Sequence, residues 1–169
     1  GWNFVRGDIP GAHNPAFDDA SWRSLDLPHD WSIEEPVDED EPAGGAGGYF
    51  PTGIGWYRKR FELPEFCRGR KILVEFDGVY QNSEVWINGS YLGRRPNGYI
   101  PFYCDLTPHL SFNRENVLVV EGGIPLEQRE TIKQELEEFS WVTGTGAAGT
   151  EITGGYYPGF MIQIGEYGS

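Results

Sequence analysis

Residues 76–107 constrain the fold of this chain more than any other stretch, because almost every position in them has a readable structural role. Val85 and Ile87 alternate with Glu84 and Trp86, which is typical of a strand that buries one face. An Asn-Gly dipeptide follows at once, and between two strand-like runs it is a strong signal for a tight hairpin. The stretch contains no arrangement of residues suited to catalysis. It therefore predicts a β scaffold without a reactive centre.

Short strand-like runs recur through the first 120 residues and are separated by turn-forming residues. Ile72, Val74 and Phe76 share one face of such a run, whereas residues 116–120 are apolar on both faces, as in a central strand. About seven short runs, with 24 Gly, 12 Pro and an aromatic content of 15%, predict an all-β fold. The expected architecture is a β-sandwich or jelly roll.

The strand pattern stops between residues 34 and 55. An acidic run at residues 38–41 is followed by several glycines and then by Tyr49-Phe50-Pro51. A loop of roughly 20 residues inside a compact domain is usually functional or mobile. Carboxylate oxygens are ligands for Ca²⁺, but the acidic run lacks the spacing of a defined calcium loop. We therefore expect a solvated loop, with no metal and no cofactor.

The sequence changes character after residue 120, and we divide the chain there into a sandwich domain, residues 1–120, and an atypical segment, residues 121–169. Residues 121–123 break the strand pattern with two glycines. Apolar residues then recur at helical spacing, which predicts a short helix over about 125–139. The stripe of this helix comprises Ile132, Leu136 and Phe139. A last strand-like run covers residues 160–164.

Charge and composition exclude two classes of partner. The formal net charge is −13 and the basic residues do not gather in one segment, so a nucleic-acid backbone would be repelled. No apolar run approaches the roughly 20 residues of a membrane span, so we expect no membrane partner. The first residues carry no signal-peptide pattern, which leaves both a cytoplasmic and a secreted or periplasmic location open. Cys67 and Cys104 are expected to be unpaired thiols.

Five motifs occur in the order and spacing of one known domain. They are Leu27-Pro28-His29-Asp30-Trp31, Gly53-Ile54-Gly55-Trp56-Tyr57-Arg58, Phe76-Asp77-Gly78-Val79, Val85-Trp86-Ile87-Asn88-Gly89, and Gly98-Tyr99-Ile100-Pro101-Phe102 with Asp105-Leu106-Thr107. Together they resemble the N-terminal sugar-binding domain of glycoside hydrolase family 2, especially its β-galactosidase branch. Each motif alone is weak, but five in register are specific. The resemblance covers residues 1–120, and residues 141–146 give only a faint echo of the segment that follows in the family.

The resemblance implies a jelly-roll, galactose-binding-like β-sandwich that packs beside a catalytic barrel. In the family the barrel carries two glutamates of a retaining hydrolase, about 5 Å apart, and a barrel needs at least some 200 residues. This chain has 169 residues, so we expect it to lack catalytic residues and to be inactive alone. Its expected role is to support the barrel and help shape the sugar pocket. The expected partners are then a galactoside-like carbohydrate and other domains of the parent hydrolase.

Two other functions remain open from the sequence. One is a free-standing carbohydrate-binding or adhesion module with the same fold. The other is an enzyme in its own right, which the absence of a credible nucleophile or acid–base pair argues against.

Exposed aromatic rings and polar donors in the loops are the candidate sugar contacts, because a ring face matches the apolar face of a pyranose. The candidates are Tyr49, Phe50, Trp56, Arg94, Arg95 and Asn97. Trp56 fits the core equally well, and the last three also fit a solvated turn.

The other motif residues are expected to be structural: His29, Asp30, Trp31, Asp77, Trp86, Tyr99 and Asp105. His29 with Asp30 also suits an acid–base or sugar-contacting pair. However, no nucleophile lies near them in the chain.

Overall fold

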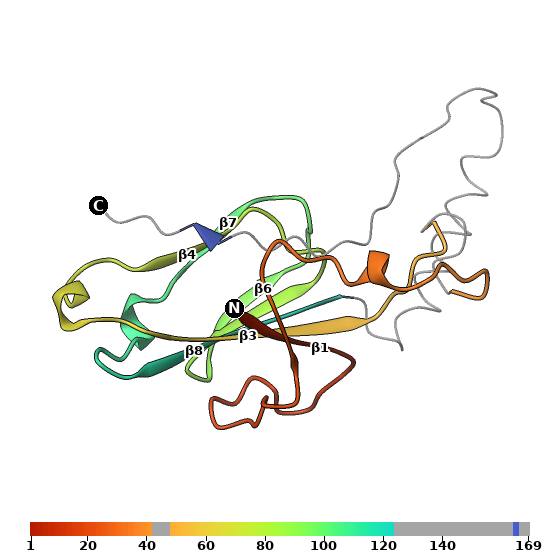
Figure 1. Cartoon of the computed structure of the whole chain (residues 1–169). Helices are drawn as coiled ribbons and strands as arrows, with labels where there is room; N and C mark the ends of the chain where they lie inside the picture. Colours follow the sequence, from red (N-terminus) through yellow and green to blue (C-terminus); the bar gives the residue numbers. More distant parts are fainter. Residues whose placement is uncertain (42–47, 124–163, 166–169) are drawn as a thin grey trace, which may run out of the picture.

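The computed structural model describes residues 1–41, 48–123 and 164–165, which form two packed antiparallel sheets (Figure 1). The strands are β1 (Trp2–Arg6), β2 (Arg23–Leu25), β3 (Ile54–Glu62), β4 (Leu73–Phe76), β5 (Ser83–Ile87), β6 (Ser90–Arg95), β7 (Phe102–Asp105), β8 (Glu115–Gly123) and β9 (Ile164–Gly165). The 3₁₀ helices are η1 (Ser32–Glu34), η3 (Glu65–Cys67) and η4 (Thr107–His109). One sheet has six strands in the order β2-β1-β3-β8-β5-β6, and the other has three in the order β7-β4-β9. The prediction of an all-β sandwich is confirmed.

Strand β8 lies between β3 and β5 at the centre of the larger sheet, as its two apolar faces predict. Leu118 and Val120 point into the core between the sheets, whereas Val119 packs on the opposite face. The predicted break at residues 121–123 is wrong, because β8 continues through Gly123, which pairs with Ile54 of β3. The two glycines do not end this strand, because both pair with β3. At Gly123 the backbone of Gly53 lies too close for a side chain.

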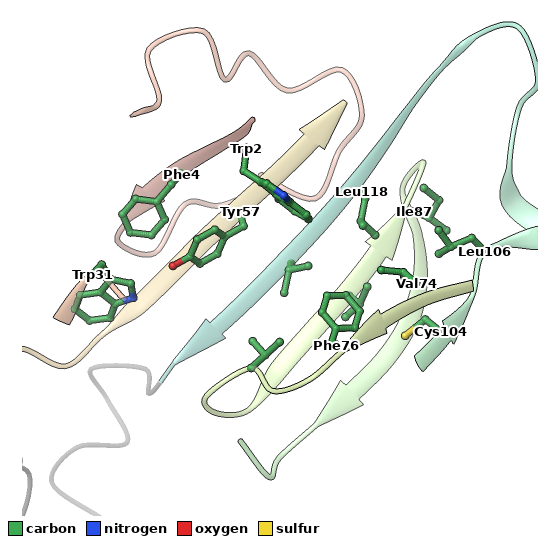
Figure 2. Close-up of a cluster of buried hydrophobic side chains, with 13 residues drawn as sticks. Trp2, Phe4, Trp31, Tyr57, Val74, Phe76, Ile87, Cys104, Leu106 and Leu118 are labelled. Carbon is green, nitrogen blue, oxygen red and sulfur yellow. The ribbon is translucent and has the colours of Figure 1, made fainter. Parts of the chain in front are cut away.

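The main core fills the space between the two sheets (Figure 2). Val74 and Phe76 face it from β4 of the smaller sheet, and Tyr57 faces it from β3 of the larger sheet. Thirteen buried residues form this cluster: Trp2, Phe4, Trp31, Tyr57, Val74, Phe76, Val79, Val85, Ile87, Cys104, Leu106, Leu118 and Val120. Cys104 and Cys67 are both free thiols, as expected.

The outer face of the larger sheet carries a second apolar cluster beneath residues 7–22, which link β1 to β2. Its buried members are Ala12, Ile54, Trp56, Trp86, Val117 and Val119. The fully buried Arg58 joins this link to the sheet, because its Nε donates to Asp19 Oδ2 over 2.9 Å and its Nη1 donates to the Ala12 carbonyl. The centre of the larger sheet is therefore buried on both faces.

The predicted hairpin turn joins β5 to β6, with Asn88 at φ 51° and Gly89 at φ 79°. These left-handed conformations are those that an Asn-Gly turn adopts. The Asn88 side chain also ties the turn to β8: its Nδ2 donates to Asn116 Oδ1 over 2.8 Å, and its Oδ1 accepts from the Val117 amide over 2.9 Å.

The predicted helix over 125–139 lies outside the described residues. Of the predicted strand at residues 160–164, only Ile164 is described, in β9, where it pairs with Phe76 of β4. The division of the chain at residue 120 remains a prediction. None of the helices among the described residues has the length and apolar character needed to span a membrane.

Candidate functional site

One end of the sandwich, where β3 begins and β8 ends, gathers the loops that carry most of the predicted sugar contacts (Figure 1). The Gly123 amide donates to the Gln81 carbonyl over 2.8 Å, and the Asn82 amide donates to the Pro96 carbonyl over 3.2 Å. These bonds connect the end of β8 to the β4–β5 loop, and that loop to the β6–β7 loop. The long loop before β3 arrives at the same place, because Gly53 lies against Gly123.

The described flanks of the long loop, residues 35–41 and 48–53, are bonded to each other. The Asp38 amide donates to the Tyr49 carbonyl over 3.0 Å, and the Thr52 amide donates to Glu41 Oε2 over 3.3 Å. Tyr49 is 41% exposed. The structure therefore places this candidate on the surface, on a flank held by hydrogen bonds, while Phe50 beside it is half-buried.

Trp31 packs beneath this loop and against the start of β3, where it is buried. A Cβ atom on Gly55 would lie 3.0 Å from the Trp31 indole nitrogen and 3.2 Å from a ring carbon of Phe4. Only glycine fits there without displacing a ring. The Gly-Ile-Gly-Trp-Tyr-Arg and Leu-Pro-His-Asp-Trp motifs thus depend on each other through a direct packing contact.

His29 is buried and sits between a phenol and a carboxylate. Its Nδ1 lies 2.9 Å from the Tyr57 hydroxyl, and its Nε2 lies 3.3 Å from Glu34 Oε1. The tautomer with its proton on Nε2, facing the carboxylate, lets Tyr57 donate to Nδ1. Burial first, and then the carboxylates of Asp30 and Glu34, raise the pKa of Tyr57, so its hydroxyl stays protonated.

Glu34 is held in turn by Arg23, whose two terminal nitrogens donate to its two carboxylate oxygens. This bidentate bond is the main reason that the pKa of Glu34 is lowered. Asp30 has a local role, since its Oδ1 accepts from the Ser32 amide over 3.0 Å and from the Ser32 hydroxyl over 2.7 Å. Asp30 therefore organises the turn into η1, whereas His29 contacts Tyr57 and Glu34.

The polar candidates lie at the end of β6 and just after it, where all three are exposed. Arg94 donates to Asn82 Oδ1 over 3.0 Å, and the guanidinium of Arg95 stands 5.5 Å from the centre of the Phe102 ring. Asn97 Oδ1 accepts from the Tyr99 amide over 2.8 Å and so shapes its own loop. Both arginine side chains are nevertheless exposed at this end of the sandwich.

Trp56 and Trp86 lie in the cluster on the outer face of the larger sheet, beneath residues 7–22. Their rings stack with centroids 5.7 Å apart, and Trp56 is only 4% exposed. Its ring offers no free face to a sugar, so Trp56 serves as a core residue of this cluster.

The remaining motif residues have separate roles. Tyr99 is 65% exposed and contacts Tyr80 edge-on, with ring centroids 5.5 Å apart. Asp105 accepts from the Thr107 amide over 3.0 Å, and hydrogen bonds from Thr107 lower its pKa. Asp77 is exposed at the end of β4. The structure therefore does not bring these three residues together.

The described part of the chain contains no group of three or more His, Cys, Asp or Glu residues that could hold a metal ion. Burial first, and then the carboxylate of Glu84 on β5, raise the pKa of Glu121 on β8, which faces Glu84 across the two strands. These side chains lie on the outer face of the larger sheet, with Trp56 and Trp86. On the same sheet, Glu84 pairs with Arg94 near the end of β6.

Comparisons with known proteins identify this architecture. A sequence model described as "Glycosyl hydrolases family 2, sugar binding domain" matches residues 19–145. The chain belongs to glycosyl hydrolase family 2. The match continues beyond residue 120, where the recognisable motifs end, and so includes part of the segment that the sequence sets apart.

Relatives of this family 2 domain include sugar-cleaving enzymes of Bacteroides and Formosa. The β-galactosidase BoGH2A of Bacteroides ovatus is 52% identical over 119 residues, and a putative β-glucuronidase of Formosa agariphila is 44% identical over 124 residues. The crystal structure of a β-glycosidase from Bacteroides vulgatus superposes with a TM-score of 0.69 at 47% identity. The superposed region covers 72% of this chain and 16% of the B. vulgatus chain.

The chain is much shorter than these relatives. The region matched by the B. ovatus protein is 70% of this chain but only 14% of that protein. The region matched by the F. agariphila protein is 73% of this chain but only 12% of that protein. The family 2 domain thus corresponds to a small part of each.

Sequence reasoning missed two residues of this family 2 domain that the structure makes prominent. Arg6 bonds to both flanks of the long loop, and no local motif marks it. Glu121 appeared only as part of a strand break, because its neighbour Glu84 is distant in the sequence. Strand pairing is the signal that would have found Glu121.

Proposed function

We propose that this chain is the non-catalytic β-sandwich domain of a β-galactosidase-like family 2 glycoside hydrolase. It supports a catalytic barrel, and its long loop forms part of the wall of a pocket for a galactoside-like sugar. The observation that carries this proposal is the partial coverage: 119 residues match at 52% identity within a β-galactosidase of which they are a small fraction.

The surface at the loop end supports the same role. Ile33, Val37 and Tyr49 are exposed on the long loop and its approach, and Tyr99 and Ile100 are exposed on the β6–β7 loop. Exposed apolar side chains on loops that meet at one end of the sandwich suit a contact with another domain or a ligand. Among the described residues of this end, His29 and Tyr57 are bonded in the interior, which suits a supporting role better than a catalytic one.

The first test uses the purified chain alone. We expect no hydrolysis of chromogenic β-galactoside or β-glucuronide, and no sugar affinity tighter than the millimolar range. Hydrolysis that persists after removal of contaminating activity would contradict the proposal. Micromolar binding of galactose or galactosides would favour a free-standing carbohydrate-binding module instead.

The second test is a chimera in which residues 1–123 replace the matching segment of BoGH2A. Because the two segments are 52% identical over 119 residues, we expect the chimera to fold and to retain galactosidase activity. BoGH2A from which the segment is deleted is the control and should lose activity. Equal activity of the deletion variant would show that the domain does not support catalysis.

A further inference from the structure

Arg6, the last residue of β1, contacts both flanks of the long loop. Its guanidinium carbon stands 4.6 Å from the centre of the Trp31 ring, and its Nη1 donates to the Glu35 carboxylate. On the other flank, its Nη2 donates to the Thr52 carbonyl over 3.2 Å. One side chain thus reaches the residues where the loop leaves the sandwich and where it returns.

The chemistry of arginine suits this position. A planar guanidinium can stack on an indole and donate in two directions in its own plane, whereas the ammonium of a lysine acts as a single point charge. The Arg6 side chain is 31% exposed, so its contacts are partly shielded from water. Two hydrogen bonds join the flanks further out, from Asp38 to Tyr49 and from Thr52 to Glu41.

We propose that Arg6 is a positioning residue that clamps both flanks of the long loop to β1 and so fixes where Tyr49 stands. Its consequence for sugar binding rests on the function proposed above. The clamp itself is independent of that function, because it involves only contacts within this domain.

Arg23 provides a matched comparison. It also pairs with a glutamate next to the loop, Glu34, through a bidentate bond. That pair lies at η1, just before the incoming flank, and the Arg23 side chain is 55% exposed. Loss of Arg23 therefore removes an ion pair of the same kind without separating the two flanks.

Hydrogen exchange of the full chain, measured without sugar, tests the clamp. The Asp38 and Thr52 amides report on the contact between the flanks, and the Val119 amide in central β8 reports on global unfolding. In Arg6→Gln we expect exchange at the two flank amides to accelerate about tenfold while Val119 is unchanged. Arg6→Lys should restore only part of the protection, and Arg23→Gln should leave the flanks as they are.

Unchanged flank exchange in Arg6→Gln would overturn the clamp, and an equal acceleration at Val119 would reduce Arg6 to a general stabilising residue. The KM of the BoGH2A chimera separates this result from the proposed function. We expect Arg6→Gln to raise KM about threefold to tenfold with kcat nearly unchanged. Faster flank exchange with an unchanged KM would leave the clamp standing and contradict the role of the loop in the sugar pocket.

Discussion

The backbones of Gly53 and Gly123 meet so closely that a Cβ atom on Gly123 would lie 1.9 Å from the Gly53 carbonyl oxygen. Gly123 also has φ 135°, a conformation that other residues rarely adopt. This contact joins the last residue of β8 to the segment that leads from the long loop into β3. It holds the loop end of the sandwich to the centre of its larger sheet.

The first prediction concerns this contact. Gly123→Ala should lower the free energy of unfolding by at least about 3 kcal/mol, because a backbone atom has to move as well as the dihedral angle. Gly11→Ala is the matched control, since Gly11 has φ 82° with nothing within 4 Å of its Cβ position. It should cost only about 1 kcal/mol. Equal losses in urea denaturation would show that the Gly53 contact is unimportant.

The second prediction concerns Glu121, which faces Glu84 directly across strands β8 and β5. Burial first, and then the carboxylates of Glu84 and Asp8, raise its pKa from 4.5 to about 7, whereas Arg94 acts in the opposite direction. A raised pKa means that ionisation of Glu121 opposes folding. Its contribution to stability is therefore present below pH 4.5 and is lost as the pH rises through about 7.

Glu121→Gln should remove this pH dependence. At pH 8 we expect the variant to be more stable than wild type by about 1–3 kcal/mol, and near pH 4 the two should be similar. Glu62→Gln is the control, because Glu62 faces Glu115 across β3 and β8 but is exposed. Denaturant unfolding at a series of pH values measures the difference. A gap that does not grow between pH 4 and pH 8 would contradict the assignment.

The third prediction concerns the buried Arg58, which bonds to Asp19 and to carbonyls of the β1–β2 link. Burial alone would raise the pKa of Asp19, but hydrogen bonds from Arg58 and Arg60 lower it. Arg58→Met leaves Asp19 and these carbonyls without their main donor, so we expect a loss of about 3–5 kcal/mol in the free energy of unfolding.

Arg60→Met is the comparison for Arg58, because Arg60 also bonds to Asp19 but its side chain is 35% exposed. It should cost only about 1 kcal/mol. Similar losses for both variants in thermal or chemical unfolding would contradict the importance of burial at Arg58.

The sequence predicted those parts of the fold that depend on local patterns. The two apolar faces of residues 116–120 indicate a central strand, and Asn88-Gly89 indicates a hairpin, because periodicity and turn chemistry involve only neighbouring residues. The extent of β8 could not be predicted in this way. Gly122 and Gly123 look like a break until β3 is known to pair with both and Gly53 to lie against Gly123.

In the candidate site, too, only the features that depend on neighbouring residues could be predicted from the sequence. Tyr49 was predicted on a loop and is exposed there, since an unpatterned acidic and glycine-rich stretch stays at the surface. The sequence could not decide whether Trp56 is a sugar contact or a core residue. Its burial depends on residues 7–22, which cover the outer face of the sheet. Arg6 carries no motif, and its importance follows only from the distant residues Trp31 and Thr52 that it contacts.

A sugar pocket walled in part by the long loop should lose affinity when Tyr49 is removed. The KM of the BoGH2A chimera for a chromogenic β-galactoside after Tyr49→Ala measures this loss. Tyr103→Ala is the control, because Tyr103 is an exposed tyrosine on β7, away from the long loop. We predict that Tyr49→Ala raises KM about tenfold, as expected for loss of one stacking contact, and that Tyr103→Ala leaves it within about twofold. An unchanged KM for Tyr49→Ala, or an equal rise for both variants, would contradict a role of the long loop in the sugar pocket.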